Sequence, residues 1–259
     1  MDEKKDLYLE ERRQEIVKQV NECGRSSVAE LAEKFGVSAV TIRADLQALV
    51  ARNKIVRTHG GAVPAGRGLG ELSLAVRSQQ QILEKSRIGA AGAALVTHGD
   101  AIILDSSSTA LAIARHLKHY RDLTILTNSL AIAYEMLDAH GVTVVMPGGT
   151  VRREMASLIG GSGLQMFRKF NIQIGFFGAH GITVAEGLTD VSAGEAKVKR
   201  PLVAMCRQVV AVLDATKWGN VGLASFADLK TVCRVITDVK APADLVEQVR
   251  VLGVQVVLV

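Results

Sequence analysis

Two patterns of apolar and polar positions divide the chain. From Leu7 to about Leu49, apolar residues recur at the spacing of one face of an α-helix. Gly24 and Gly36 interrupt this pattern and leave three short segments. The sequence therefore predicts three small helices in this part of the chain.

From about Glu84 onward, short β-branched runs alternate with helical stretches. This alternation is typical of βαβ units and predicts a mainly parallel sheet covered by helices. Between the two patterns, Pro64–Gly70 combines a proline with three glycines, which resist regular structure. We therefore expect a small N-terminal domain (1–63), a linker (64–83) and an α/β domain (84–259). The strands that we expect are Ala101–Leu104, Leu123–Leu126, Val142–Val145, Ile172–Phe177, Val209–Leu213, Val232–Ile236 and Val254–Leu258.

The second and third predicted helices have the signals of a helix-turn-helix. Ser27 and Glu30 form a capping box, and Gly36 supplies a left-handed stop. Ser38 then caps the next helix, so a three-residue turn joins the two helices. The third helix buries one stripe, which consists of Ile42, Leu46 and Leu49.

The opposite face of the third helix is small, polar or cationic, which suits the major groove of DNA. Lys54–Arg57 and Ala62–Val63 follow as two short strands around a tight turn, which is a wing. The alternative is a packing or dimerisation module with solvated basic side chains. The order of cap, turn, helix and wing favours DNA binding. The candidate DNA-binding residues are Ser38, Val40, Thr41, Arg43, Ala44, Gln47, Arg57 and His59.

The distribution of charge agrees with this interpretation. The net charge of the chain is +5, which by itself is only compatible with an acidic partner. Residues 38–63, however, hold four basic side chains and one acidic side chain. A basic stretch over the third helix and the wing is what phosphate contacts require.

Polar and glycine-rich turns follow successive predicted strands of the α/β domain. They are 105–109, Thr127–Ser129, Gly148–Arg153 and Gly178–Gly181. Because ligands of open α/β sheets bind beyond the carboxyl ends of strands, we expect these turns to line one crevice. The hydroxyl-rich turn 105–109 leads into a predicted helix, and the N-terminus of a helix favours a bound phosphate. The alternative is that the hydroxyl groups of this turn only cap the helix. Either Arg152 or Arg153 has the geometry to bind a phosphate.

Two later segments add charged candidates. Glu195 and Lys199 are four residues apart, and the plain interpretation is a salt bridge on a helix surface. The alternative places Glu195 or Lys197 on sugar hydroxyls. Further on, 214–219 leaves a strand with a carboxylate, a hydroxyl and an ammonium close together, and we expect its Trp218 to be a core residue.

Several segments resemble the DeoR family of bacterial regulators of sugar metabolism. The N-terminal motifs are Val28–Ala32, Val37–Ser38, Thr41–Leu46 and Arg57–Ala62, and the resemblance covers residues 9–259. This chain departs from the family pattern at two positions. Ala44 stands where a second arginine is usual in the family, and Ser107 stands where the family usually has a glycine. The resemblance implies a sensor domain similar in fold to ribose phosphate isomerase and CoA-transferase domains.

The resemblance also implies a function: a repressor whose affinity for an operator falls when a phosphorylated sugar binds the sensor domain. The implied partners are a double-stranded DNA operator, the small phosphorylated sugar effector and further copies of the chain, as a dimer or tetramer. An activator, or a sensor of an unphosphorylated ligand, is a further alternative. The implied effector-binding residues are Asp105, Ser106, Ser107, Ser108, Thr109, Asn128, Ser129, Gly149, Arg152, Gly181, Glu195, Lys197 and Lys217.

An enzyme is the alternative from another class. A sugar phosphate isomerase with an appended DNA-binding module could draw acid and base groups from several polar residues. The charged residues of a sugar site are equally needed to bind hydroxyl groups, and a fold does not fix a function, so we expect no catalytic residue and no enzyme activity. The acid and base candidates are Glu195, Asp105, Asp190 and Lys217.

Other features bound the class of protein. No apolar run approaches the roughly 18 residues that cross a bilayer, and Met1–Asp6 is charged, unlike a secretory signal. We therefore expect a cytoplasmic protein without membrane contact. Three scattered cysteines offer neither a disulfide framework nor a metal knuckle, so we expect reduced core thiols, no metal and no cofactor. They are Cys23, Cys206 and Cys233.

Overall fold

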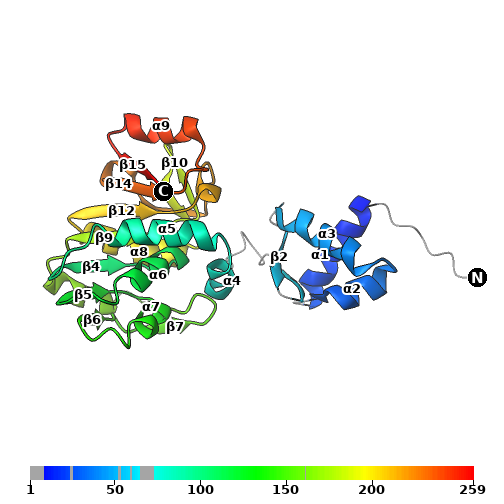
Figure 1. Ribbon diagram of the computed structural model, residues 1–259, viewed down its shortest axis with the longest axis horizontal. Helices are drawn as coiled ribbons and strands as arrows, with labels where there is room; N and C mark the ends of the chain where they lie inside the picture. Colours follow the sequence, from blue (N-terminus) through cyan, green and yellow to red (C-terminus); the bar gives the residue numbers. More distant parts are fainter. Residues whose placement is uncertain (1–8, 24–25, 52–53, 59, 65–72, 161) are drawn as a thin grey trace, which may run out of the picture. The chain divides into compact units, whose positions relative to one another are not determined.

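The computed structural model describes residues 9–23, 26–51, 54–58, 60–64, 73–160 and 162–259 (Figure 1). The chain divides into two compact units, residues 1–72 and 73–259. The boundary lies within the stretch 64–83 that the sequence assigns to a linker, and residues 73–83 belong to the second unit.

The N-terminal unit contains three helices and a small antiparallel sheet. The helices are α1 (Leu9–Cys23), α2 (Val28–Phe35) and α3 (Ala39–Ala51). The strands are β1 (Ser26–Ser27), β2 (Ile55–Thr58) and β3 (Gly61–Pro64), in the order β1-β3-β2. The predicted helices and wing are confirmed, and β1 is an addition that the sequence did not predict. The buried side chains of this unit form one core, made of Ile16, Val20, Leu31, Ile42, Leu46, Leu49, Ile55 and Ala62.

Local signals explain how this unit folds. The Ser27 hydroxyl accepts a hydrogen bond from the Glu30 N–H (3.1 Å), and the Glu30 carboxylate accepts one from the Ser27 N–H (2.7 Å), so the capping box is formed. Gly36 ends α2 with a φ of 63°, in the left-handed region. At Gly61, a Cβ atom would lie 2.1 Å from the carbonyl oxygen of Ser26. Glycine therefore lets β1 approach the wing.

The second unit is built on a seven-stranded parallel sheet, which confirms the predicted fold class. Its order is β15-β14-β12-β9-β4-β5-β6, and every strand begins and ends within two residues of its predicted bounds. Branched aliphatic residues dominate these strands, because both faces of the sheet are covered. The strands are β4 (Ala101–Leu104), β5 (Leu123–Leu126), β6 (Val142–Val145), β9 (Ile174–Phe177), β12 (Gln208–Val212), β14 (Arg234–Thr237) and β15 (Gln255–Leu258).

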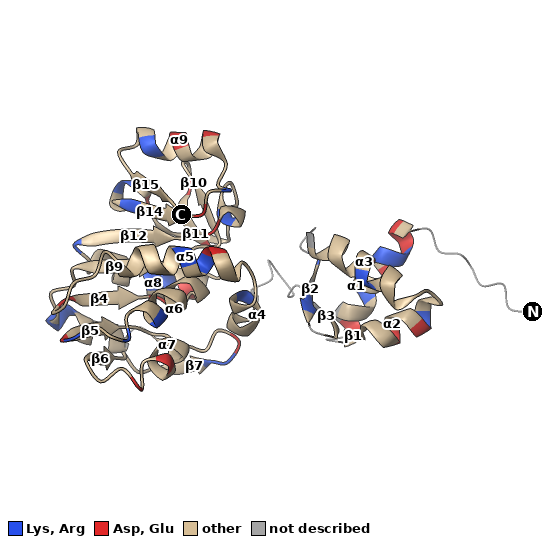
Figure 2. Cartoon of the chain, viewed as in Figure 1, with Lys and Arg blue, Asp and Glu red and all other residues tan. Residues whose placement is uncertain are grey.

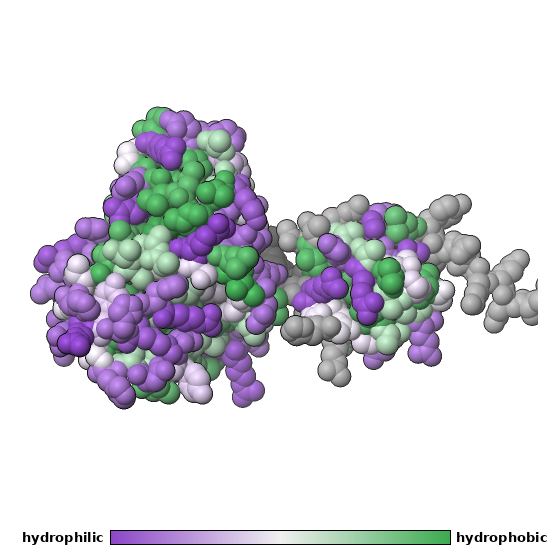
Figure 3. All heavy atoms as spheres, in the orientation of Figure 1, coloured by the Kyte–Doolittle hydropathy of each residue, from purple (hydrophilic) through white to green (hydrophobic). Residues whose placement is uncertain are grey.

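Helices cover both faces of this sheet and bury one apolar cluster on each. One cluster includes Ile88, Ile113 and Ile132, from α5 (Ile82–Ala93), α6 (Ser108–His116) and α7 (Leu130–Glu135). The other includes residues of α8 (Ala193–Ala204) and α9 (Ala243–Val251). Figure 1 shows α5, α6 and α7 on the viewer's side of the sheet. Apolar surface remains near the start of α5 and near the C-terminus, where Figure 3 shows green patches.

Several smaller elements had no clear signal in the sequence. Helix α4 (Leu74–Ser78) precedes α5, and a hairpin of β7 (Thr150–Arg152) and β8 (Ser157–Ile159) follows β6. The strands β10 (Gly181–Thr183), β11 (Gly187–Asp190) and β13 (Ala224–Ala227) form a separate antiparallel sheet. Short 3-10 helices complete the unit; they are η1 (Ser162–Lys169), η2 (Ala215–Lys217) and η3 (Leu229–Thr231).

The structure also tests the expected core residues. Trp218 is 6% exposed and its indole N–H donates to the Thr237 hydroxyl, so it is a core residue as predicted. The expectation of three core thiols is wrong, because Cys23 and Cys233 are exposed. Cys206 is partly buried, and burial raises the pKa of its thiol to about 12.

Candidate functional site

The outward face of α3 carries most of the predicted DNA-binding residues. Val40 is 72% exposed, and Arg43, Ala44 and Gln47 are exposed as well. The hydroxyl of Ser38 accepts a hydrogen bond from the Thr41 N–H at 3.1 Å, which caps the helix. Since the buried stripe holds the other side of α3 in the core, this face is presented to solvent in a fixed orientation.

The wing carries the other two predicted DNA-binding residues. Arg57 is exposed on β2, whose basic position is blue in Figure 2. His59 lies outside the described residues. β2 and β3 pair in antiparallel register from Ile55↔Pro64 to Thr58↔Gly61, which positions Arg57 next to the turn.

A buried ion-pair cluster that the sequence did not predict fixes α3 to α1. The carboxylate of Asp45 on α3 is 1% exposed. It accepts hydrogen bonds from Nε of Arg12 (2.7 Å) and Nε of Arg13 (2.9 Å), both on α1. A carboxylate with two guanidinium partners restricts the rotation of α3. Asp45 therefore orients the helix rather than contacting a ligand.

The turns at the carboxyl ends of the parallel strands supply most of the predicted effector residues. Residues 105–109 follow β4, Thr127–Ser129 follow β5, and Gly178 follows β9. In the order of the sheet, β9, β4 and β5 are neighbours, so these turns lie at one edge. The residues of 105–109 and Thr127–Ser129 are all less than 9% exposed.

Asp105 and Lys199 form the buried centre of this edge. The Asp105 carboxylate accepts hydrogen bonds from the N–H of Ser107 (3.0 Å) and of Gly178 (2.9 Å), and its Oδ2 lies 3.0 Å from Nζ of Lys199. Lys199 also donates to Asp190 at 2.7 Å. Burial disfavours the charged ammonium, but the nearby charges of Asp105 and Asp190 outweigh it and raise the pKa of Lys199. Lys199 is thus a cation held between two carboxylates.

This arrangement corrects the expectation of a surface salt bridge on α8. Glu195 and Lys199 are 2% and 5% exposed, so both point into the unit. Lys199 bonds to Asp105 and Asp190, and Glu195 bonds elsewhere. The i,i+4 spacing correctly placed the two on one face of α8, but that face is buried.

Glu195 connects two of the predicted turns. Its Oε1 lies 2.8 Å from a terminal nitrogen of Arg152 on β7, and its Oε2 accepts a hydrogen bond from the Ser106 hydroxyl at 3.3 Å. Arg152 is half-buried, whereas Arg153 is exposed. The structure therefore brings Arg152, and not Arg153, to the other predicted residues.

Some predicted residues mainly support the backbone. The Ser107 hydroxyl accepts from the Ala110 N–H and caps α6, and Ser129 caps α7 in the same way. The side-chain amide of Asn128 donates to the carbonyl of Leu158 in β8. Gly149 has a φ of 127°, which L side chains rarely adopt, and a Cβ at Gly181 would lie 1.9 Å from the carbonyl oxygen of Asn220.

Lys197 is the predicted effector residue that the structure separates from this edge. It is exposed on α8, two positions from the buried Glu195 and Lys199. Residues two apart on a helix do not face the same side. The Lys197 side chain therefore lies on the solvent side of α8.

The charge of Lys217 acts on two further ionisable residues, Lys85 and His180, which the sequence did not single out. Burial, together with the charges of Lys217 and Arg77, lowers the pKa of Lys85 to about 8, against the opposing charge of Asp214. Burial and the charge of Lys217 also lower the pKa of His180. The positive charges of Lys217 and Arg77 thus act on both Lys85 and His180. Arg77 lies inside the stretch 64–83 that the sequence assigned to the linker, and Lys85 follows that stretch by two residues, so neither was singled out.

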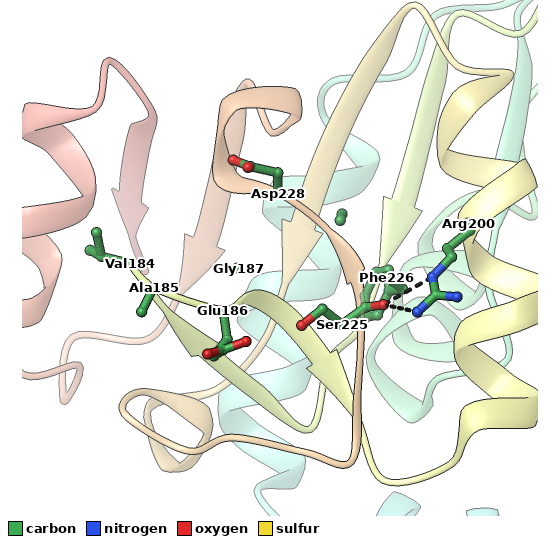
Figure 4. Close-up of a pocket in the computed structure, with 9 residues that line it drawn as sticks. Val184, Ala185, Glu186, Gly187, Arg200, Ser225, Phe226 and Asp228 are labelled. Atoms are coloured by element: carbon green, nitrogen blue, oxygen red, sulfur yellow. Dashed lines mark hydrogen bonds between the residues drawn. The ribbon is translucent and has the colours of Figure 1, made fainter.

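A separate surface hollow of about 360 Å³ is lined by the turn between β10 and β11, by β13 and by Arg200 of α8 (Figure 4). In Figure 4, the Arg200 guanidinium points at the carbonyl oxygen of Ser225, to which it donates twice, at 3.0 and 2.7 Å. The residues that line the hollow, among them Glu186 and Asp228, do not coincide with the predicted effector residues. Its one lining guanidinium is already bound by a backbone carbonyl, so it is a poor anion site.

Comparison with known proteins identifies the family. The family model of a DeoR-like helix-turn-helix domain matches residues 12–65, and that of a DeoR C-terminal sensor domain matches residues 80–239. The chain belongs to the DeoR family. It is therefore a DNA-binding transcriptional regulator with a helix-turn-helix domain and a sensor domain.

Individual relatives agree with this assignment. The uncharacterized HTH-type transcriptional regulator YgbI of Escherichia coli (strain K12) is 38% identical over 228 residues, which cover 88% of this chain and 89% of that protein. The glycerol-3-phosphate regulon repressor of the same strain is 29% identical over 232 residues, with 90% and 92% covered. These names describe regulators, which favours the regulator over the alternative of an enzyme.

Solved structures add only a weak likeness. Ribose 5-phosphate isomerase A from Methanocaldococcus jannaschii is 16% identical, with a TM-score of 0.39, over 52% of this chain and 53% of that chain. A likeness at this level carries no argument about function. Among the described residues of this DeoR-family regulator, no helix is long and apolar enough to cross a membrane.

Proposed function

We propose that this DeoR-family regulator represses genes of sugar metabolism and releases its operator when a phosphorylated sugar occupies the crevice at the carboxyl ends of β4, β5 and β9. In this proposal, α3 enters the major groove and the wing contacts the backbone of the duplex. The effector binds among Asp105–Thr109, Asn128, Ser129, Gly149, Arg152, Gly181, Glu195 and Lys217.

The observation that carries the proposal is the convergence of Arg152, Ser106 and Glu195. A guanidinium offers bidentate hydrogen bonds to a phosphate, and a buried carboxylate accepts hydrogen bonds from sugar hydroxyls. The turn 105–109 leads directly into the N-terminus of α6, where the helix dipole favours an anion. These groups together suit a ligand with both hydroxyl groups and a phosphate.

The positive charges of Lys217 and Arg77 support the same ligand class. Lys85 and His180 both have lowered pKa values, because burial and neighbouring positive charge disfavour their protonated forms. An anion bound beside them would relieve that repulsion. Phosphorylated ligands are therefore preferred over neutral sugars.

The proposal includes assembly into a homo-oligomer of this chain. Helix-turn-helix proteins generally read two half-sites as dimers. Leu83 and Val239 are 75% and 62% exposed, which is apolar surface that a second copy of the sensor unit can cover. Analytical ultracentrifugation of the full chain measures the state directly, and a monomer at all concentrations would contradict this part of the proposal.

The test begins with selection of bound sequences from a random pool of DNA duplexes, which yields the operator. The melting temperature is then recorded with glycerol 3-phosphate, pentose and hexose phosphates, their unphosphorylated parents and inorganic phosphate. A compound at a hundredfold excess over its Kd stabilises the native state by about 2.7 kcal/mol. We expect stabilisation by a phosphorylated compound and not by its parent.

Fluorescence anisotropy with the selected duplex completes the test. The stabilising compound is expected to weaken duplex binding, because an effector acts by binding one conformation more tightly than the other. Arg152→Ala is expected to abolish the stabilisation, while Arg153→Ala on the same hairpin retains it. A duplex affinity that is unchanged at saturating effector would contradict the proposal.

A further inference from the structure

Helix α4 is the first element of the second unit, and its N-cap, Ser73, is the first residue of that unit. The hairpin β7–β8 contacts it at two points. The N–H of Leu74 donates to the carbonyl of Glu154 (2.8 Å), and the Arg77 guanidinium donates to the sulfur of Met155 (3.7 Å). Glu154 and Met155 form the turn of the hairpin whose first strand ends with Arg152.

The same hairpin also contacts residues of the proposed effector site. Arg152 pairs with Glu195 at 2.8 Å, and the Leu158 N–H donates to the carbonyl of Asn128 (2.8 Å). The Leu130 N–H donates to the carbonyl of Ala156, also at 2.8 Å. One short hairpin thus connects α8, the turn after β5 and α4.

Helix α4 is also held from its other end. Nζ of Lys85 on α5 donates to the carbonyls of Arg77 (2.6 Å) and Gln80 (2.8 Å), at the C-terminus of α4. Burial lowers the pKa of Lys85, the charge of Asp214 raises it, and the charge of Lys217 lowers it. Helix α4 further packs against α6, which starts at the hydroxyl-rich turn.

The joints on either side of α4 are strained and incompletely hydrogen-bonded. Of the three non-glycine residues with positive φ in the described ranges, Gln81 (50°) joins α4 to α5 and Ala156 (45°) lies in the hairpin. Five buried side-chain polar atoms in those ranges have no hydrogen-bond partner, and three of them belong to Arg77, Ser78 and Ser157. Backbone strain concentrates at active sites, ligand clamps and switch regions, and buried polar atoms without a partner are rare in native proteins.

We propose that the β7–β8 hairpin and α4 form a relay that carries the state of the crevice to the junction with the DNA-binding unit. Arg152 pairs with the Glu195 carboxylate, and the anionic effector competes for the same guanidinium. When the effector takes Arg152, the hairpin moves, and the contacts of Glu154 and Met155 with α4 change. Glu154 and Met155 are positioning residues in this scheme. The relay rests on the proposed function, since it assigns a route to the regulation of that site.

The first experiment needs neither effector nor operator. Amide hydrogen exchange is measured across residues 73–81 in the full-length wild type, in Arg152→Ala and in Arg153→Ala. Arg152→Ala is expected to speed exchange of the Leu74 amide by about tenfold, because its acceptor Glu154 is no longer anchored through Arg152. Arg153→Ala is expected to match the wild type. Equal exchange in Arg152→Ala and the wild type would overturn the relay, whatever the effector proves to be.

The second experiment uses the selected duplex and the phosphorylated compound that raises the melting temperature. Leu74→Pro removes the N–H that bonds to Glu154, and proline is tolerated at the first position of a helix. Leu74→Ala keeps the N–H and removes the side chain, so it is the matched control. Both variants are expected to bind the compound and, without it, the duplex.

The response is the ratio of the duplex affinity without the compound to that with it. We expect this ratio to be at least about tenfold smaller in Leu74→Pro than in the wild type, and unchanged in Leu74→Ala. A full response in Leu74→Pro would overturn the relay. Absence of any response in the wild type would instead contradict the proposed function, and the exchange experiment would still decide the relay.

Discussion

The ammonium group of Lys199 lies 3.0 Å from the carboxylate of Asp105, although one residue is on α8 and the other follows β4. β4 and β9 are neighbours in the parallel sheet, and Gly178, which follows β9, accepts a hydrogen bond from Lys199 through its carbonyl (2.8 Å). Three separate segments therefore meet at one buried cation. This cluster supports the wall of the proposed effector crevice.

Replacing Lys199 by methionine leaves the carboxylates of Asp105 and Asp190 buried without their cation. We expect Lys199→Met to lower the unfolding free energy at pH 7 by about 3–5 kcal/mol, as measured by urea denaturation. Lys197→Met, on the solvent side of the same helix, is the control and is expected to change stability by less than about 0.5 kcal/mol.

The pH dependence of that variant has a definite sign. Burial raises the pKa of Asp190, but the charge and hydrogen bond of Lys199 outweigh it and hold the pKa below 3.8. A lowered carboxyl pKa contributes stability above pH 3.8 and loses it as the pH falls through the folded-state value. The difference between the wild type and Lys199→Met is therefore expected to shrink below pH 3.8. A constant difference down to pH 2 would contradict the pairing.

Arg43 tests the DNA-binding face. Removing one phosphate contact weakens binding to all duplexes and lowers the slope of log affinity against log salt by about 1. We expect this of Arg43→Ala in anisotropy titrations across salt concentrations. Lys18→Ala, which removes a 62% exposed cation from α1, is the matched control. Similar losses in both variants would indicate a nonspecific effect of net charge.

Ala44 offers the converse experiment. It is exposed at the centre of the same face. Ala44→Arg is expected to tighten duplex binding and to increase the salt slope by about 1, because it adds a phosphate contact. An unchanged salt slope would show that position 44 does not face the backbone of the duplex.

Asp45 tests the orientation of α3. Asp45→Ala leaves Arg12 and Arg13 half-buried without their carboxylate. We expect a loss of about 3–5 kcal/mol in the unfolding free energy of the N-terminal unit, followed by calorimetry, with the transition of the sensor unit unchanged. Glu33→Ala, at an exposed position on α2, is expected to be neutral.

Lys85 makes stability depend on pH in the alkaline range. Burial lowers its pKa from 10.5 to about 8, so the unfolded chain binds more protons than the folded chain between these values. The unfolding free energy therefore rises with pH across this window, by up to about 3 kcal/mol from this group. Lys85→Arg stays charged and is expected to lack this rise. Parallel pH profiles of the two proteins would show that Lys85 has an ordinary pKa.

Much of this fold was predictable from the sequence, because local patterns determine its helices and strands. The capping box at Ser27 and Glu30, the left-handed Gly36 and the stripe through Ile42 each act within one or two helical turns. The seven parallel strands were readable because burial on both faces demands continuous branched runs. Short elements such as α4 and the β7–β8 hairpin lack such runs, so the sequence does not predict them.

The candidate site was predictable only in part. Asp105, Arg152 and Glu195 were found because they sit in polar turns or at the start of a helix, and the structure brings them together. Lys199 was misjudged, since i,i+4 spacing reveals a shared helix face but not whether solvent or protein covers it. Lys197 was predicted to bind the effector, but its side chain lies on the exposed face of α8.

What the sequence determined by itself is the class of each segment and the family, since both depend on order and spacing along the chain. Only the tertiary structure decided which charges are buried together. Asp45 meets Arg12 and Arg13, and Asp105 meets Lys199, through helix packing and strand order that join distant positions. Pairing in a desolvated interior depends on three-dimensional proximity, and no local pattern in the chain encodes it.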